Sequence, residues 1–342
     1  MVCELGGYRC PLIPSTNSGG GREEKLKERK RGWVEVKMDG NVERRERRDF
    51  FSYGISIDLE DWYHPEFVRK RISGNTTDQI VEATLPILNL LDRYQTKVSF
   101  FVVGEVAERN PGLIKLIYQG GHEIGCHSFS HKPLWELTES HFRGELEHFH
   151  SVMEGILGKV KIKGFRAPTF SLDGRTKWAL GVLRDFGYQY DASIFPVRLS
   201  RLYGMDGVPT RPYRISLEDV TQEDPQSPLI EFPMSLLTIG KLKIPFVGGF
   251  YFRLFPLPFL SWGLKRINRH YPIILYFHPW ESYGKTPRLK IPLYDRFILY
   301  YGNHSMLRKL EYLLKHFKFV RIDQVLGLYQ GDPNIESGDS GT

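Results

Sequence analysis

The sequence predicts an α/β protein in which helices cover a mainly parallel β-sheet. Between residues 50 and 330, short apolar runs of strand length alternate with longer segments whose apolar residues recur at the helical period. Gly and Pro separate these segments, as where Pro111 begins a helical pattern that Gly120 and Gly121 end. Strands that are joined through helices lie parallel. The sequence therefore leaves two architectures open, a βα barrel or a doubly wound sheet.

The expected elements follow one another in regular order. Strands are expected at residues 53–57, 98–103, 122–126, 161–165, 188–190, 229–232, 273–277 and 319–322. Helices are expected at residues 80–91, 111–119, 138–157, 176–186 and 303–315. The segment 196–262 breaks the alternation because it is rich in Pro, Gly and aromatic residues, and no helix is expected before about Pro258. A stretch of this kind is typical of an insertion or a functional segment.

The two ends of the chain differ in composition from the part between them. Residues 1–49 contain a Ser/Gly-rich stretch and a dense mixed-charge run, which have little apolar surface to bury. We expect this segment to be a disordered or weakly helical extension, and Met38 is a plausible alternative start, which would make residues 1–37 non-native. Residues 50–330 are expected to form one domain, followed by a flexible tail at 331–342.

Charge and cysteine content exclude several classes of protein. The net charge is +7, and residues 1–49 contribute +3 of it through twelve Lys/Arg and nine Asp/Glu, which leaves +4 for the other 293 residues. A domain so close to neutral is not expected to bind nucleic acid. Three cysteines do not make a disulfide framework. No signal peptide and no apolar run of about 20 residues is evident, so a cytoplasmic protein without a membrane span is expected. The oligomeric state stays open.

Reactive side chains follow four of the expected strands. The four clusters are Asp58-Leu59-Glu60-Asp61, His127-Ser128-Phe129-Ser130-His131, Arg166-Ala167-Pro168-Thr169-Phe170 and the single residue His278. In a βα barrel the active site lies at the carboxyl ends of the strands. Four clusters at such ends therefore predict one shared active site.

The histidine spacing indicates a metal site. His127 and His131 are four residues apart, which is one helical turn, so both rings could face one ion. The third ligand is expected to be a carboxylate from the segment 58–61. Two histidines and one carboxylate leave coordination positions open for water and substrate, as in catalytic rather than structural sites. The same donors also serve non-haem iron oxygenases, but those enzymes usually have jelly-roll barrels.

These motifs, in this order, resemble the NodB-type polysaccharide deacetylases, carbohydrate esterase family 4, over roughly residues 53–322. The family's histidine motif matches residues 127–131, and its R-x-P-x-aromatic motif matches residues 166–170. Its last two motifs resemble Asp191-Ala192-Ser193 and Leu275-Tyr276-Phe277-His278. The first motif differs from the family's usual form, because this chain has the pattern D-x-[DE] at Asp58-Leu59-Glu60 where many members have two adjacent aspartates. That variant, with Trp62-Tyr63-His64 and residues 248–253, resembles the subgroup of exopolysaccharide loci with PEP-CTERM sorting systems.

The resemblance implies a fold and an activity. The fold is a distorted (β/α) barrel of the NodB type, similar to a TIM barrel but with seven strands. The activity is metal-dependent removal of acetyl groups from N-acetylated amino sugars, a hydrolysis of non-peptide carbon–nitrogen bonds in exopolysaccharide biosynthesis or modification. The implied metal is zinc, with cobalt, nickel or manganese as alternatives. The implied partner is an acetylated amino-sugar polymer or oligosaccharide, and whether the acetyl group is N- or O-linked stays open.

The resemblance also implies a role for each motif residue. Asp58 is the general base, and Arg166 holds its carboxylate. Glu60 points to the same side of the chain as Asp58, which favours it as the third metal ligand over Asp61. His278 is the acid that protonates the leaving amine. The remaining assignments are Asp191 as a support for His278 or Arg166, and Pro168, Phe170 and Trp62 as substrate-binding residues.

Alternative interpretations exist for the residues and for the whole chain. Asp58 could cap a helix, Arg166 could form a surface ion pair, and His278 could be a core histidine. An allantoinase-type cyclic-amide hydrolase on the same fold also resembles the D-x-[DE] variant. A non-catalytic sugar-binding module is the other alternative, against which the presence of Asp58, Arg166 and His278 argues.

Overall fold

The computed structural model describes residues 33–38, 41–46, 51–72, 76–198 and 204–328. The chain divides into two compact units, Met1–Phe50 and Phe51–Thr342. In the first unit, β1 (Trp33–Met38) pairs antiparallel with β2 (Asn41–Glu46), which differs from the disordered or weakly helical state expected there. The rest of the expected extension and the tail 331–342 lie outside the described residues.

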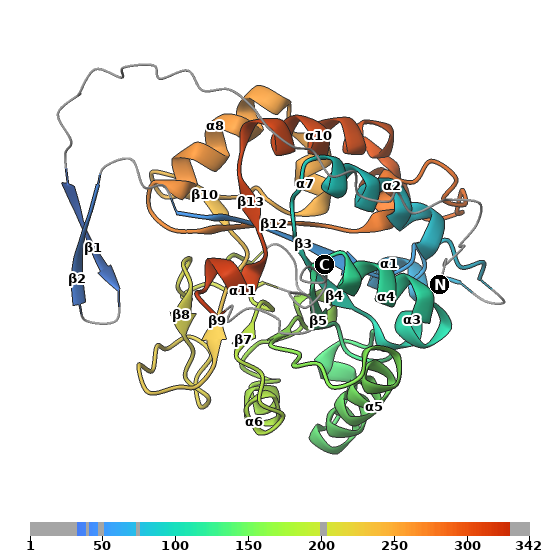
Figure 1. Ribbon diagram of the computed structural model, residues 1–342, viewed down its shortest axis with the longest axis horizontal. Helices are drawn as coiled ribbons and strands as arrows, with labels where there is room; N and C mark the ends of the chain where they lie inside the picture. The colour runs from blue at the N-terminus through green and yellow to red at the C-terminus, as the bar shows by residue number, and fades with distance from the viewer. Residues whose placement is uncertain (1–32, 39–40, 47–50, 73–75, 199–203, 329–342) are drawn as a thin grey trace, which may run out of the picture. The chain divides into compact units, whose positions relative to one another are not determined.

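The second unit is built on one nine-stranded sheet among the described residues. Seven strands form a parallel series in the order β12, β3, β4, β5, β6, β7 and β9. Their bounds are Ile273–Phe277, Tyr53–Leu59, Ser99–Val102, Glu123–Cys126, Gly164–Phe165, Tyr190–Asp191 and Ile230–Glu231. The short strand β8 (Tyr213–Arg214) pairs antiparallel with β9, and β13 (Phe319–Val320) pairs parallel with β3. This curled sheet with its helices confirms the expected α/β fold of the distorted-barrel type (Figure 1).

Helices surround the strands of this unit. In Figure 1, α2, α8 and α10 lie on one side of the strands, and α5 and α6 lie on the opposite side. The α-helices are α1 (Glu66–Arg69), α2 (Ile80–Arg93), α3 (Gly104–Arg109), α4 (Pro111–Gln119), α5 (Glu139–Leu157), α6 (Trp178–Asp185), α7 (Gly249–Leu254), α8 (Leu257–Asn268), α9 (Leu293–Tyr300), α10 (Met306–His316) and α11 (Ile322–Val325). The 3-10 helices are η1 (Leu134–Glu136), η2 (Pro168–Phe170), η3 (Pro279–Ser282) and η4 (Asn303–Ser305). No helix in the described part of the chain combines the length and the apolar character needed to cross a bilayer.

Local sequence signals account for the bounds of the longer helices. Pro111 occupies the first turn of α4, where its missing N–H costs nothing. Thr138 caps α5 by accepting a hydrogen bond from the His141 amide, and Gly158, at a φ of 75°, ends the helix. These helices therefore begin and end within a residue of the positions that the sequence predicts.

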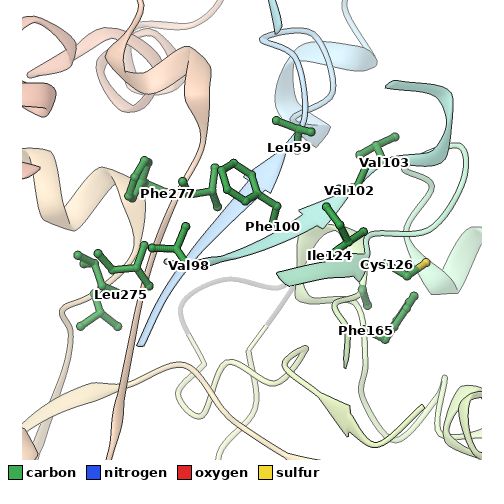
Figure 2. Close-up of a cluster of buried hydrophobic side chains, with 14 of the residues drawn as sticks. Leu59, Val98, Phe100, Val102, Val103, Ile124, Cys126, Phe165, Leu275 and Phe277 are labelled. Carbon is green, nitrogen blue, oxygen red and sulfur yellow. The ribbon is translucent and has the colours of Figure 1, made fainter. Parts of the chain in front are cut away.

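The two faces of the sheet carry different side chains, because successive strand residues point to opposite sides. Ile57 of β3, Phe100 of β4 and Phe277 of β12 pack in the large core between the sheet and the helices. Phe101 belongs to a second apolar cluster on the inner side of the curled sheet, the side that Asp58 also faces. Figure 2 shows the outer core with Leu59, Val98, Phe100, Val102, Val103, Ile124, Cys126, Phe165, Leu275 and Phe277 labelled.

The segment 196–262 contains more regular structure than its sequence indicates. It holds β8 and β9, a hairpin of β10 (Leu236–Ile239) and β11 (Leu242–Pro245), and the short helix α7. The expectation of no helix before Pro258 is therefore wrong. Gly248 and Gly249 obscure α7 in the sequence, because glycine has low helix propensity, yet they lie at its N-cap and first position.

Candidate active site

Two consecutive inward positions of β3 and its following turn carry carboxylates. Asp58 is the last but one residue of β3, and Glu60 follows it after one outward residue, Leu59. Both carboxylate side chains are nearly fully buried, at 2% and 3% relative exposure for the two residues. Strand alternation therefore brings both groups to the same side, at the carboxyl end of the sheet.

Arg166 follows β6 and holds Asp58. Its Nη1 lies 2.6 Å from Asp58 Oδ1 and donates to Ser56 Oγ at 2.9 Å, while Nε donates to the Ala192 carbonyl at 3.1 Å. The guanidinium is fully buried and lies 4.2 Å from the centre of the Phe101 ring. A buried, charge-assisted bond of this kind restricts the carboxylate to one orientation.

His127 and His131 are joined by a loop. The helical turn that their spacing in the sequence predicts is not formed. Residues 127–131 have no helical structure, and Ser128 and His131 adopt φ values of 63° and 55°. Glu145 of α5 holds this loop, because its carboxylate accepts from the amides of Phe129 and Ser130 at 3.0 and 3.2 Å and from both serine hydroxyls. The left-handed residues turn the loop back on itself, so the two histidines point to one place.

Glu60, His127 and His131 form a cluster that fits a divalent metal ion. Their ligand atoms lie within 4.8 Å of one another, and His131 Nε2 is 2.5 Å from Glu60 Oε2. His127 Nδ1 is 2.7 Å from the Arg166 carbonyl, which only accepts, so Nδ1 carries the proton and Nε2 presents a lone pair. Burial lowers the pKa of His127 to about 4, which keeps the ring neutral. Burial alone would raise the pKa of Glu60, but the adjacent histidines lower it well below its ordinary value.

His278 follows β12 and approaches the two carboxylates. Its Nε2 lies 3.8 Å from Asp58 Oδ2 and 3.5 Å from Glu60 Oε1. Its Nδ1 lies 2.9 Å from Glu281 Oε2, which also accepts the His278 amide at 2.9 Å. Burial would lower the pKa of His278, but Glu60 and then Glu281 outweigh it and raise that pKa to about 9. The imidazole is therefore positioned and charged as a proton donor.

Sequence reasoning missed the residues that hold His278. Glu281 is buried and accepts from Arg253 Nε at 2.9 Å and Nη2 at 2.7 Å. The remaining Arg253 donors reach the carbonyls of Ile298 and Tyr301 and the Asn303 side chain. The sequence feature that could have indicated this network is Arg253 within the apolar run 249–254. A charged side chain in such a run is buried only where it has a partner of opposite charge.

Asp61 is turned away from the cluster. Its carboxylate accepts from the amides of Trp62 at 2.8 Å and Gln79 at 2.7 Å. Burial, and then a hydrogen bond with Asp78, raises the pKa of Asp61 to about 7. The structure thus brings Glu60, and not Asp61, to the two histidines. The reason is that successive side chains of an extended chain point to opposite sides, and Asp61 lies an odd number of positions after Asp58.

Asp191 does not reach His278 and instead supports the loop that carries Arg166. Its carboxylate accepts from the Ser193 hydroxyl, and Ser193 Oγ accepts from the Ala167 amide at 2.7 Å. Burial raises the pKa of Asp191 to about 6, beside the buried carboxyl of Glu231. Of the two supporting roles expected for Asp191, the structure is consistent with the one next to Arg166.

Of the three expected substrate-binding residues, two are buried in the protein and one is half-buried. Trp62 is 5% exposed, lies in a cluster with Val68, Trp280 and Leu299, and donates its indole N–H to the Thr77 carbonyl at 3.1 Å. Pro168 is buried. Phe170 is half-buried, and its ring centre lies 5.2 Å from that of Tyr276. Trp62 is therefore packed beneath the site, and its role as a substrate contact stays a prediction.

Comparison with known proteins identifies two consecutive family matches. The model of the polysaccharide deacetylases matches residues 69–190, and that of a domain of unknown function (DUF3473) matches residues 192–327. The first match contains His127, His131 and Arg166. Asp58 and Glu60 precede it, and His278 lies within the second match. The site described above therefore draws on residues inside and outside the deacetylase match.

Individual relatives agree with the first match. A peptidoglycan-N-acetylglucosamine deacetylase of Bacillus cereus is 33% identical over 100 residues, covering 29% of this chain and 36% of the relative. Chitin deacetylase 1 of Cryptococcus neoformans is 31% identical over 109 residues, covering 32% and 23%. The chain thus spans about a third or less of these relatives. A solved structure from Mycobacterium smegmatis, assigned to the polysaccharide deacetylases, superposes with a TM-score of 0.52 at 17% identity over 82% of this chain and 91% of that one, which shows the shared fold. Residues 69–190 of this chain thus match the polysaccharide deacetylases, carbohydrate esterase family 4, and the fold and the sequence motifs agree with that match.

Proposed function

We propose that this protein is a metal-dependent hydrolase that removes acetyl groups from N-acetylated amino sugars of a polysaccharide or oligosaccharide. The observation that carries the proposal is the arrangement around Asp58. Its carboxylate is held by Arg166 on one side, and it lies beside the cluster of Glu60, His127 and His131 on the other. His278 Nε2 stands 3.8 Å from the same carboxylate, so a base and an acid border one reaction space.

Glu60, His127 and His131 are the residues that would hold the metal ion. Two imidazoles and one carboxylate form the ligand set of many catalytic zinc sites, and cobalt, nickel or manganese would accept the same donors. When bound, a divalent ion polarises the acetamide carbonyl and makes water more acidic. An unactivated acetamide is a poor electrophile, which is why the chemistry needs such an ion.

The residues around the cluster divide the proton transfers between them. Asp58 accepts a proton from the attacking water, and Arg166 keeps its carboxylate correctly oriented. His278 delivers a proton to the sugar nitrogen, so the carbon–nitrogen bond breaks with a neutral amine as the leaving group. The products are acetate and the free amino sugar. Glu281 retains the His278 ring in position during both steps.

The relatives suggest the substrate class. Their names refer to peptidoglycan N-acetylglucosamine and to chitin, which are both N-acetylated amino-sugar polymers. We infer a substrate of that class, with a place in exopolysaccharide synthesis or modification because of the D-x-[DE] motif variant. A cytoplasmic location stays a prediction from the sequence.

The test is acetate release from N-acetylglucosamine oligomers, with an O-acetylated xylan as a second substrate and with or without a chelator. We expect release from the N-acetylated oligomers, loss of release with the chelator, and recovery on adding zinc. His127→Ala and His131→Ala should lose bound metal and activity together. Full metal occupancy in both variants would contradict the assigned ligands.

The same assay separates the alternative functions. An allantoinase-type enzyme would open a cyclic amide and release no acetate. A sugar-binding module would bind the oligomers without turnover. An oxygenase would need Fe(II) and molecular oxygen, which the deacetylation reaction does not consume.

A further inference from the structure

Helix α9 and the residue that follows it form an exposed apolar surface that the proposed reaction does not use. Leu293, Tyr294, Phe297 and Tyr301 are 82%, 74%, 46% and 43% exposed. We call these four residues the α9 patch. A tyrosine–leucine pair exposed at this level, with two more aromatic rings adjoining, is the kind of surface that marks an interaction site.

Exposed cations lie within α9 and in the segment just before it, without matching carboxylates. Lys285, Arg288, Lys290 and Arg296 are exposed, and among the described residues none of them has a carboxylate within ion-pair distance. Arg288 lies over the Tyr300 ring at 4.7 Å. The only acidic residue between positions 284 and 301 is Asp295, whose carboxylate pairs with Arg71 at 2.8 Å. The rim is therefore positively charged, and its partner should be negative.

This combination of apolar centre and cationic rim narrows the choice of partner. A deacetylated amino-sugar polymer carries ammonium groups, which the rim would repel. A second copy docked through the same patch would bring two cationic rims together. An anionic lipid bilayer satisfies both parts, because its headgroups attract Lys and Arg while Leu, Phe and Tyr enter the interface.

We propose that the α9 patch docks this protein on an anionic lipid bilayer surface, without a membrane-spanning segment. Docking here would bring the active site close to that surface. The inward residue Leu299 of α9 packs with Trp62 and Trp280, and the Trp280 indole donates to Glu60 Oε1 at 3.2 Å. The proposal concerns where the protein binds and is independent of the reaction that it catalyses.

Co-sedimentation of the full chain with vesicles tests the proposal. We expect binding to vesicles of equal parts phosphatidylglycerol and phosphatidylcholine, little binding to phosphatidylcholine alone, and weaker binding at high salt because salt screens the charges. The test variant combines Lys290→Gln with Leu293→Ser. Loss of the lysine alone should weaken binding about fivefold, and loss of the leucine should weaken it further.

The β10–β11 hairpin provides a matched control. Lys241→Gln with Leu242→Ser removes the same residue types at exposed positions, with Leu242 62% exposed, and should bind like the wild type. The basic residues of segment 1–49 are unchanged in both variants and so cancel in the comparison. Equal binding by the test variant and the control would overturn the proposal, as would failure of the wild type to bind anionic vesicles. Patch-dependent dimers in sedimentation velocity, or patch-dependent binding of a soluble acidic polysaccharide in place of vesicles, would also overturn it. Acetate release is measured separately on soluble oligomers.

Discussion

At the scale of single residues, alternation along β3 assigns different surroundings to three neighbouring carboxylates. Asp58 and Glu60 point inward, to Arg166 and to the histidines. Asp61 points to the backbone amides of Trp62 and Gln79. These different surroundings follow from the alternation of side chains in an extended chain. Because Asp58 contacts Arg166 and Glu60 contacts the histidines, substitutions at positions 58 and 60 should have separable effects.

The first prediction separates the base from the metal ligand. Asp58→Asn has nearly the same shape but cannot accept a proton, so it should keep its metal and lose roughly a hundredfold or more in turnover. Glu60→Gln should lose metal affinity. Metal analysis and acetate release on both variants rank the two carboxylates. Normal turnover of Asp58→Asn would refute the mechanism.

The second prediction concerns the carboxylate that faces His278. Glu281→Gln removes a negative neighbour, so the pKa of His278 should fall from its raised value of about 9. The protonated acid is then lost at a lower pH, and the alkaline limb of the kcat profile should move to lower pH. Arg253→Lys keeps a cation beside Glu281 and should retain the profile while losing stability, because a buried network is broken. An unchanged profile in Glu281→Gln would show that this carboxylate has no influence on the acid.

At the scale of elements, the metal-binding loop depends on a helix that contributes no ligand. Glu145 of α5 accepts hydrogen bonds from three successive residues of the loop between His127 and His131. Similarly, α7 approaches η3 so closely that an added Cβ at Gly249 would lie 1.8 Å from Glu281 Oε2. The positions of the reacting groups are thus set by packing between elements.

The third prediction tests the support of the loop. Glu145→Ala leaves the amides of Phe129 and Ser130 without their acceptor, which should cost about 1–3 kcal/mol of stability. Metal affinity should fall by about 10- to 100-fold, because the ligands lose their supporting bonds. Calorimetric titration with zinc measures this. Glu147→Ala, exposed on the same helix, is the control and should bind zinc like the wild type. Equal zinc affinity in both variants would show that Glu145 does not support the metal ligands.

At the scale of the whole molecule, several buried histidines should make the fold sensitive to acid. Burial lowers the pKa of His64 and of His122 to about 3 and that of His127 to about 4. Below about pH 6.5 the unfolded chain binds protons that these folded-state groups do not. Stability is therefore fully present above that pH and is lost as the pH falls toward the folded values.

The fourth prediction isolates His122, which lies outside the metal cluster. Its Nδ1 accepts the Val98 amide at 3.2 Å, and an asparagine oxygen can take that place. His122→Asn should lose about 1.4 kcal/mol less stability per pH unit than the wild type between about pH 6 and pH 4. Urea unfolding at several pH values measures the slope. Parallel slopes would mean that His122 becomes protonated in the folded state or is not buried in solution.

Local patterns in the sequence account for the main strands, the long helices and the inward residues of the site. Strand periodicity predicted β3 and β12, and with them the common side of Asp58 and Glu60 and the place of His278 after β12. The caps and breakers of α4 and α5 are equally local. These features depend on residues within a few positions of one another, so they could be predicted without knowledge of the fold.

Only the tertiary structure decided which distant groups meet. The histidine pair lies on a loop held by Glu145, His278 is held by Glu281 and Arg253, and Asp191 supports the Arg166 loop. Strands were expected from the sequence at residues 161–165, 188–190 and 229–232, but pairing with neighbouring strands set the two-residue bounds of β6, β7 and β9. The physical reason is that a buried polar group must find a partner, and the partner is selected by how the elements pack and not by its distance along the chain.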